Sequence, residues 1–316
     1  MKNPAFFRGV KKKKRYFEGW YFKCISKDRK YAVALIPGMA IDPDGHKHAF
    51  VQVIHATTGK TYYFEFPYTH FHASNKDFSV TIDDNTFGAH GLTVAIDQPD
   101  KGSLSGKLSF SDIHAYPTSP LHPGIMGPFS FVPNMECNHV IIHMSHAISG
   151  QLILDGEVLD FEDGIGYIEK DYGRSFPQYY VWIQAGHFND GEASLVFSRA
   201  SIPFAGTEFP GFFAYFTNFK DTHARFATYN RSKLEKWHVD SKSGTCSAQL
   251  KGPSGRLNIE AKIFGGGTLR APTNGRMDRQ IVESISAEVK IELRDKENKI
   301  IYNGTSREVG MEICME

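Results

Sequence analysis

The residue types best suited to chemistry gather in the stretch GPFSFVPNMECNHVIIHMSH, residues 127–146. It holds one carboxylate, Glu136, and three imidazoles, His139, His143 and His146, among large apolar residues in a strand-like alternation. Burial in such surroundings disfavours the charged form of a carboxylic acid and raises its pKa, which makes the acid a proton donor near neutral pH. An exposed or hydrogen-bonded glutamate on a strand would instead have only a structural role.

A second group of ionisable residues follows in GIGYIEKDYGRSFP, residues 164–177. Glu169, Lys170 and Asp171 leave a predicted strand where the first half of the chain passes to the second, and ligand clefts commonly form at domain junctions. The alternative is a linker whose carboxylates pair with Lys170 and Arg174, because exposed ion pairs are common and weakly stabilising.

Histidines are frequent, 14 in all, and some are spaced like metal ligands. On a strand, His139 and His143 share one face, and His146 takes the other unless a bulge intervenes. Further histidines that could join a zinc site are His46, His48, His55, His70 and His72. So many histidines produce such pairs by chance, and no HxxxH helix or third carboxylate ligand is defined. We therefore expect proton transfer or packing here, and neither a metal nor another cofactor.

The elements that must position these residues are strands. Runs of about five to nine residues with period-two alternation, such as GWYFKCI, AFVQVIHA, YVWIQAGHF, GFFAYFTNF and AEVKIELR, are bounded by Gly, Asp, Asn, Pro or Ser. The pattern predicts an all-β chain.

The two halves of the chain repeat the same order of runs. YFEGWYFKCI parallels SFPQYYVWIQ, which matches Trp20 with Trp182, and GPFSFVPNMEC parallels GRMDRQIVES, which places Glu136 opposite Glu283. Such repetition indicates tandem copies of one β unit. The expected parts are a basic leader over residues 1–15, an N-terminal domain over 16–173 and a C-terminal domain over 174–316.

An antiparallel sheet of about eight strands avoids exposed edges most simply by closing into a barrel, which can hold one small ligand. We therefore expect two β-barrels, with a pair of β-sandwiches as the alternative. The 25 Phe and 14 Tyr favour strands and line apolar pockets, so the expected partner is a hydrophobic small molecule. Trp20 and Trp182 are expected to plug the barrel cores; alternatively, their faces could stabilise a cationic intermediate by about 0.5 to 2 kcal/mol each.

Composition excludes several classes of function. The 36 basic and 35 acidic residues of the 316-residue chain nearly cancel, so no net field favours nucleic acid. The GxSxG, GxxxxGK[ST] and dinucleotide-binding signatures are absent, which argues against serine hydrolases and nucleotide chemistry.

Location follows from the cysteines and from hydropathy. Cys24, Cys137, Cys246 and Cys314 lack CxxC spacing, which predicts a reducing, cytoplasmic location without a disulfide framework. No apolar run reaches the length of a membrane helix, so we expect a soluble protein. The run KKKKR, Lys11 to Arg15, could make peripheral contact with anionic lipid or could be a solvated leader.

Several motifs resemble the tocopherol cyclase-like family. They are FEGWYFK (residues 17–23), MGPFSFVPNMEC (126–137), GYIEKDYGRSFP (166–177) with YVWIQAGHF after it, and ESISAEVKIEL followed by GMEI. They occur in order over nearly the whole chain, which is similar to a bacterial-type member because it lacks the long transit region of a plastid enzyme. Tyr172 stands where the plant pattern has Trp.

The resemblance implies two tandem lipocalin- or calycin-like antiparallel β-barrels and an isomerase that cyclises a prenylated benzoquinol to a chromanol. That reaction needs an acid to protonate an alkene, an apolar cavity around the tertiary cation, and a phenol oxygen that closes the ring. On this chain the acid would be Glu136 or Asp171, and its partner Glu169 or His139. The aromatic lining would be Trp20, Tyr21, Phe129, Tyr180 and Trp182.

Two other functions suit the same fold. One is a non-catalytic carrier of a hydrophobic small molecule. The other is a hydratase, which would use the same acid to add water to an alkene. The sequence defines no oligomeric state.

Overall fold

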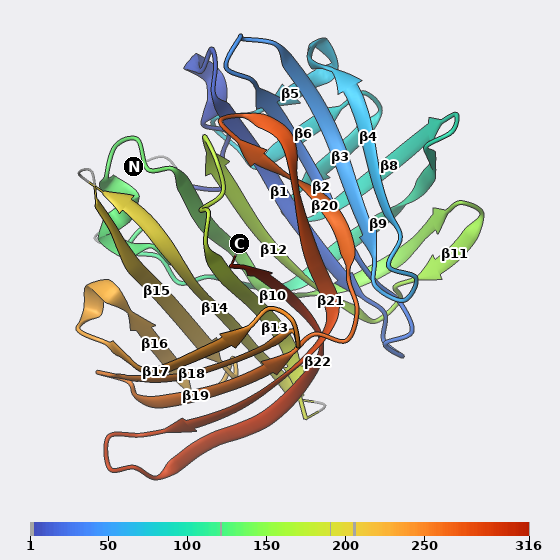
Figure 1. Ribbon diagram of the computed structural model, residues 1–316. Helices are drawn as coiled ribbons and strands as arrows, with labels where there is room; N and C mark the ends of the chain where they lie inside the picture. The colour runs from blue at the N-terminus through green and yellow to red at the C-terminus, as the bar shows by residue number, and fades with distance from the viewer. Residues whose placement is uncertain (1–2, 121, 190, 205–206, 316) are drawn as a thin grey trace. The chain divides into compact units, whose positions relative to one another are not determined.

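The computed structural model describes residues 3–120, 122–189, 191–204 and 207–315, so the first two residues of the predicted leader lie outside the described residues. Within these ranges, strands form nearly all of the regular structure, and the remaining regular elements are short 3-10 helices (Figure 1). The predicted all-β fold is confirmed.

The strands of the first half are β1 (Tyr16–Ile25), β2 (Ala32–Ile41), β3 (Lys47–His55), β4 (Thr61–Pro67), β5 (Phe71–Ala73), β6 (Ser79–Ile82), β7 (Asn85–Gly88), β8 (Gly91–Gln98), β9 (Gly102–Ala115), β10 (Cys137–Leu154), β11 (Glu157–Asp160) and β12 (Gly164–Gly173). Those of the second half are β13 (Tyr180–Phe188), β14 (Gly191–Phe204), β15 (Thr207–Thr217), β16 (His223–Ala227), β17 (Lys233–Asp240), β18 (Thr245–Gly252), β19 (Gly255–Lys262), β20 (Gly267–Thr273), β21 (Arg276–Arg294) and β22 (Ile300–Cys314). The 3-10 helices are η1 (Gly9–Lys11), η2 (Tyr68–His70), η3 (Gly127–Phe131) and η4 (Thr228–Asn230).

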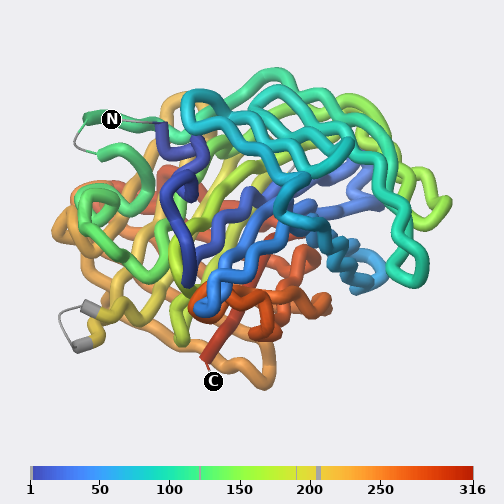
Figure 2. The backbone as a smooth tube through the Cα atoms, turned by 90° about the horizontal axis from the view of Figure 1, so that it is seen from above, coloured from blue at the N-terminus to red at the C-terminus, as the bar shows by residue number. Residues whose placement is uncertain are grey.

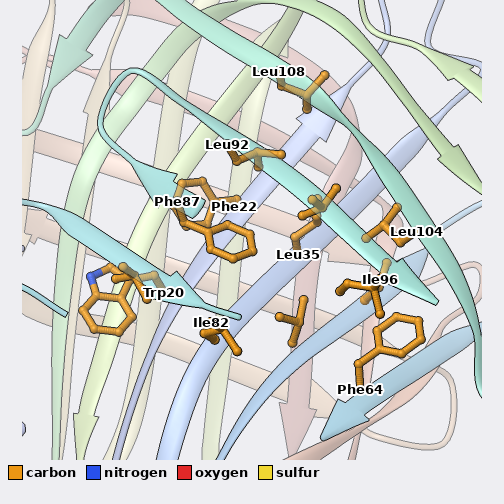
Figure 3. Packing of buried hydrophobic residues seen from close by; sticks show 14 of the residues in the cluster. Trp20, Phe22, Leu35, Phe64, Ile82, Phe87, Leu92, Ile96, Leu104 and Leu108 are labelled. Atoms are coloured by element: carbon orange, nitrogen blue, oxygen red, sulfur yellow. The ribbon is translucent and has the colours of Figure 1, made fainter. Parts of the chain in front are cut away.

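The first sheet has 12 strands among the described residues, in the order β4-β3-β2-β1-β12-β10-β9-β8-β7-β6-β5, with β11 paired to β10. One face carries an apolar core cluster to which strands from both ends of this order contribute (Figure 3). Trp20, Phe22 and Cys24 of β1 belong to this cluster, because alternate residues of a strand point to the same face. We call the opposite face of this sheet the outer face.

The second sheet has ten strands in the described part of the chain, in the order β16-β15-β14-β13-β22-β21-β19-β18-β17, with β20 paired to β21. Each half of the chain begins with a meander of four strands, β1 to β4 in the first sheet and β13 to β16 in the second. The first strand of each meander also pairs with the last strand of its half, β1 with β12 and β13 with β22. The shared order is what a tandem duplication predicts.

The alignment of the two halves made from sequence is out of step at two places. Trp20 lies in the core of the first sheet, whereas Val181 and Ile183, on either side of Trp182, lie in the core of the second. Glu136 precedes β10, whereas Glu283 lies within β21. A slip of one residue reverses the face of every side chain on a strand, which explains the tryptophan mismatch.

The chain forms two compact units. Unit 1 comprises Met1–Phe176 and Thr268–Gln280, and unit 2 comprises Pro177–Gly267 and Ile281–Glu316. All four cysteines are free thiols. The described residues contain no helix with the length and hydropathy that crossing a membrane requires.

A hairpin made of β20 and the start of β21 packs within unit 1, beside β2 and β3 (Figure 1 and Figure 2). The amide of Gln52 on β3 pairs with the backbone of Arg270: Nε2 donates to the carbonyl oxygen at 2.9 Å, and Oε1 accepts from the N–H at 2.8 Å. At the hairpin tip, Gly275 has φ +80° and lies against the carbonyl of Ile41, where a Cβ would collide with backbone. This contact therefore requires glycine.

Candidate functional site: a histidine between two carboxylates

The register of β10 against β12 brings three predicted residues together. His139 is the cross-strand partner of Asp171, and Ile141 is the partner of Glu169. Directly opposed residues of an antiparallel pair point to the same face, and so do residues two apart on one strand. His139, Glu169 and Asp171 therefore share the outer face of the first sheet.

The imidazole of His139 lies between the two carboxylates. Its Nδ1 is 3.0 Å from Oδ1 of Asp171, and its Nε2 is 3.4 Å from Oε2 of Glu169. The side chain of Glu169 is only 6% exposed, whereas that of Asp171 is 18% exposed. Asp171 is therefore the carboxylate of the pair that a substrate reaches more easily.

Glu169 has a fixed hydrogen-bond donor. The hydroxyl of Tyr167, two residues earlier on the same face, donates to Oε2 of Glu169 at 2.6 Å. Burial, and then the charge of Glu169, raise the pKa of Tyr167 well above its ordinary value, so the phenol keeps its proton. Tyr167 precedes Glu169 on the strand and Asp171 follows it. The hydrogen bond from Tyr167 thus holds the Glu169 carboxylate in place.

Two sulfur atoms also touch the group. The thiol of Cys137 donates to Oδ1 of Asp171 at 3.6 Å, and burial, followed by the charge of Asp171, raises the thiol pKa well above its ordinary value. Cys137 is therefore a neutral thiol and a poor nucleophile. The backbone N–H of His139 donates to Sδ of Met126, so the loop before β10 is tied to the start of the strand.

The arrangement can store and pass protons. An imidazole with a carboxylate at each nitrogen can take a proton from one carboxyl group and return it through the other ring nitrogen. The buried Glu169 also stabilises a positive charge on His139. The group can therefore relay a proton between its two carboxyl groups.

The same three residues are the one group of His, Cys, Asp and Glu in the described residues whose ligand-type atoms could hold a metal ion, all within 4.8 Å of one another. The two ring nitrogens of His139 face different carboxylates. A single ion could therefore take only one of those nitrogens. The histidines that the sequence suggested for zinc, His46, His48, His55, His70 and His72, do not belong to this group.

Glu136, the other predicted acid, lies just before β10 and is half-buried. Its Oε1 is 3.7 Å from Nε of Arg174, and its carbonyl oxygen accepts hydrogen bonds from the N–H groups of Arg174 and Ser175. Its carboxylate is not one of the two that meet at His139. The alternative of a linker whose own carboxylates pair with Lys170 and Arg174 is not what the structure has, because Arg174 lies next to Glu136 and Lys170 pairs with Glu18.

The predicted aromatic lining divides between several places. Tyr21 is the cross-strand partner of Glu169 and shares the outer face with it. Trp20 points the other way and is fully buried in the core (Figure 3). Phe129 is half-buried in η3.

In unit 2, Tyr180 and Trp182 of β13 lie on the face turned away from that unit's core, where Trp182 is the cross-strand partner of Glu312. The hydroxyl of Tyr180 donates to Oε2 of Glu312. Glu283 on β21 is the cross-strand partner of Glu312, and both carboxylates are buried. Glu312 was not among the predicted site residues.

Glu18 and Lys170 form a buried ion pair on the core face of β1 and β12, with 2.6 Å between Nζ and Oε1 and no exposure of either side chain. Alternation in FEGWYFK gives the signal for it: Glu18 must share a face with Trp20 and Phe22, which are core residues. The linker alternative gives Lys170 a role only in weak exposed ion pairs, so this buried pair was not predicted.

His143 and His146 also form a buried pair, because two irregularities in β10 break the alternation between Ile141 and His146. Their Nδ1 atoms are 3.2 Å apart, and the ring of His146 packs on Phe110 with centroids 4.2 Å apart. Its ring also covers Gly166, where a Cβ would collide with it. The predicted shared face of His139 and His143 is therefore lost to the irregular strand.

This histidine pair predicts acid sensitivity. Burial, with a smaller effect of His90, lowers the pKa of His143 from 6.5 to about 4, so the unfolded chain binds more protons than the folded chain between these values. The stability that His143 contributes is thus fully present above pH 6.5 and is lost as the pH falls to 4, by about 3 kcal/mol. Urea unfolding at pH 7, 5.5 and 4.5 measures it.

His143→Gln should flatten this pH dependence, whereas His72→Gln, at an exposed position, should leave it unchanged. An identical pH profile for His143→Gln and wild type would contradict the assignment.

The described residues form an all-β protein with two large antiparallel sheets, and His139, Glu169 and Asp171 meet on one of them. The family model "Tocopherol cyclase-like" matches residues 93–315, more than half of the chain. The protein therefore belongs to the tocopherol cyclase-like family, as its motifs suggested.

Three solved structures of low sequence identity share the fold. CghA is 12% identical with a TM-score of 0.57, covering 95% of this chain and 88% of its own. The structure from Nitrosomonas europaea that bears the name AttH (NE1406) is 11% identical with a TM-score of 0.56, covering 94% and 92%. Kievitone hydratase from Nectria haematococca is 11% identical with a TM-score of 0.52, covering 99% and 94%. No curated protein matches the chain.

Proposed function

We propose that this protein is a cofactor-independent cyclase that protonates the alkene of a prenylated aromatic alcohol, such as a prenylated benzoquinol, in an apolar pocket. The observation that carries the proposal is the imidazole of His139 held between the carboxylates of Glu169 and Asp171. Family membership supports a cyclase among the reactions that such an acid can perform.

In the proposed cycle, Asp171 is the catalytic acid. Its proton passes to the less substituted alkene carbon, which forms a C–H bond and leaves a tertiary cation. The phenol oxygen attacks the cation and forms the C–O bond, and the phenol proton returns to the Asp171 carboxylate. Nothing is added or lost, so the reaction is an isomerisation.

The other residues of the group act through position and charge. His139 stabilises the Asp171 carboxylate after proton transfer, and Glu169 with Tyr167 fixes the imidazole. Tyr21 supplies an aromatic face next to Glu169, and such a face can stabilise a developing cation by about 0.5 to 2 kcal/mol.

We propose that each sheet closes into a lipocalin- or calycin-like barrel, the first built from strands within residues 16–173 and the second from strands within residues 174–316. Core residues of the first sheet come from β4 and β5, at opposite ends of its strand order, which supports strong curvature. CghA, of similar fold, has been solved with Sch210972.

A hydratase is the second candidate, favoured by the fold shared with kievitone hydratase. The same acid would generate the same cation, and water would then take the place of the phenol oxygen. The two activities differ in their products: the chromanol has the mass of the substrate, whereas the hydrate is heavier by one water.

The test is incubation of the purified protein with a prenylated benzoquinol under nitrogen, followed by mass spectrometry and chromatography of the products. We expect a chromanol that is absent from the control without protein. A hydrated product would assign the hydratase, and binding without turnover would assign the carrier. Mass spectrometry of lipids that co-purify with the protein would identify the natural ligand class.

We also propose peripheral membrane contact through the basic run Lys11 to Arg15. All five side chains are exposed, and Val10 before them is 58% exposed. Each basic residue near an anionic surface contributes about 1 kcal/mol. Sedimentation with phosphatidylserine vesicles should therefore exceed that with phosphatidylcholine vesicles, and Lys12→Glu/Lys14→Glu should weaken it at least tenfold. Equal sedimentation with both vesicles would refute the contact.

A further inference from the structure

Three polar side chains lie inside the first sheet, on the face opposite the candidate site. Glu18 and Trp20 come from β1 and Lys170 from β12, and each is fully buried. Lys170 Nζ is 2.6 Å from Glu18 Oε1 and 5.0 Å from the centre of the Trp20 ring. The group thus combines two hydrogen-bond donors with one carboxylate at the edge of an apolar core.

The segment of residues 3–8, which we call the N-terminal strap, occupies this group. Three backbone carbonyl oxygens of the strap accept hydrogen bonds from the two donors. Trp20 Nε1 donates to the carbonyl oxygen of Ala5 at 3.0 Å. Lys170 Nζ donates to the carbonyl oxygens of Pro4 at 3.1 Å and Phe6 at 2.7 Å. The strap therefore presents carbonyl groups to the donors.

The strap also fills apolar space. The side chains of Ala5 and Phe7 are buried in the core cluster, and the ring of Phe7 lies edge-on to Phe71 with 5.4 Å between centroids. Two backbone hydrogen bonds hold the strap. The N–H of Phe7 donates to the carbonyl oxygen of Ser74, and the N–H of Arg8 donates to the carboxylate of Glu18. Residues 3–8 form no strand, and segments without strand pairing open more easily than the paired strands below them.

A purely structural plug would not need charges here. Burying an ion pair costs desolvation that an apolar pair of the same size avoids, so a buried pair is weak evidence for a stabilising role. The presence of Trp20 Nε1 and Lys170 Nζ in the core is better explained by their binding partners. These partners are the carbonyl oxygens of an apolar segment.

We propose that Glu18, Trp20 and Lys170 form a second small-molecule site, for an apolar molecule with a carbonyl oxygen, which the N-terminal strap occupies when no ligand is bound. The ligand carbonyl takes the place of the Ala5 and Phe6 carbonyls, and its apolar body takes the place of Phe7. This site faces away from His139 and Asp171, so it stands or fails separately from the proposed cyclase.

The test uses two fluorescent probes with the full chain. Prodan is an apolar naphthalene with a ketone whose emission responds to its surroundings, and N-phenyl-1-naphthylamine is an apolar probe without a carbonyl. Phe7→Asp, which cannot bury its charge and so releases the strap, should bind Prodan at least tenfold more tightly than wild type. The matched control Phe7→Leu should bind like wild type.

Adding Glu18→Gln and Lys170→Met to Phe7→Asp removes both charges together, and the gain for Prodan should be lost while affinity for N-phenyl-1-naphthylamine is kept. Asp171→Asn should leave Prodan binding unchanged. Equal Prodan affinity of Phe7→Asp and wild type, or a gain that survives the Glu18 and Lys170 substitutions, would overturn the site.

A second measurement does not depend on the folding of any variant. In wild-type protein at saturating Prodan, hydrogen exchange of the Phe7 and Arg8 amides should accelerate, because the ligand displaces the strap that protects them. Unchanged or slower exchange at these amides, or no Prodan binding at all, would refute displacement.

Discussion

Asp171→Asn should lower the turnover of a prenylated benzoquinol by a hundredfold or more, with little change in affinity. Asparagine has the same shape and can still bond to His139, but it cannot release a proton to an alkene. Positioned proton donors typically contribute 10²- to 10⁴-fold to a rate, which sets the expected loss. Single-turnover assays measure the rate, and titration with the unreactive quinone measures the affinity.

Companion variants separate the two acids that the sequence left open. Glu136→Gln should keep turnover within a few-fold of wild type, because Glu136 pairs with Arg174 and lies outside the group around His139. Asp97→Asn, at an exposed strand position, controls for the loss of one carboxylate. If Glu136→Gln abolished turnover while Asp171→Asn did not, the assignment of the acid would be wrong.

The second large effect concerns stability. Lys170→Met should lower the free energy of unfolding of unit 1 by about 3 to 5 kcal/mol, because it leaves the Glu18 carboxylate buried without its cation. Burial lowers the pKa of Lys170 to about 8, and Glu18 opposes this shift because its carboxylate favours the charged ammonium. Hydrogen exchange of the β1 and β12 amides reports the loss locally.

The double variant Glu18→Gln/Lys170→Met should recover most of this stability, because removing both charges leaves no buried charge without its partner. Lys27→Met breaks an exposed ion pair with Asp163 and should leave exchange in unit 1 unchanged. A double variant as unstable as Lys170→Met alone would show that the lysine acts through its stem or its bonds to the strap, and not through the pair.

Much of the fold was predictable because period-two alternation is local information. The all-β class, the tandem order of strands and the family all follow from short runs and their sequence. What alternation cannot give is the exact face when a strand is irregular. The breaks in β10 turned His143 and His146 toward each other, and a one-residue slip matched Trp20 with Trp182 instead of with an adjacent core residue, Val181 or Ile183.

The candidate site was predictable in its residue types but not in its grouping. His139, Glu169 and Asp171 were all named, yet His139 lies 30 or more residues before the two carboxylates in sequence, and only the register of β10 on β12 brings it to them. Register depends on turns and on tertiary packing, which one sequence does not state. Tyr167 and Glu18 were missed because their roles exist only through side-chain partners, Glu169 and Lys170.

The hairpin of residues 268–280 means that the polypeptide enters unit 1 twice. No single cut in the gene can therefore release both units whole: division after Phe176 would strip unit 1 of the segment that Gln52 and Ile41 hold. A truncated protein, a split reporter or a chimaera that contains unit 1 must therefore include the hairpin of residues 268–280.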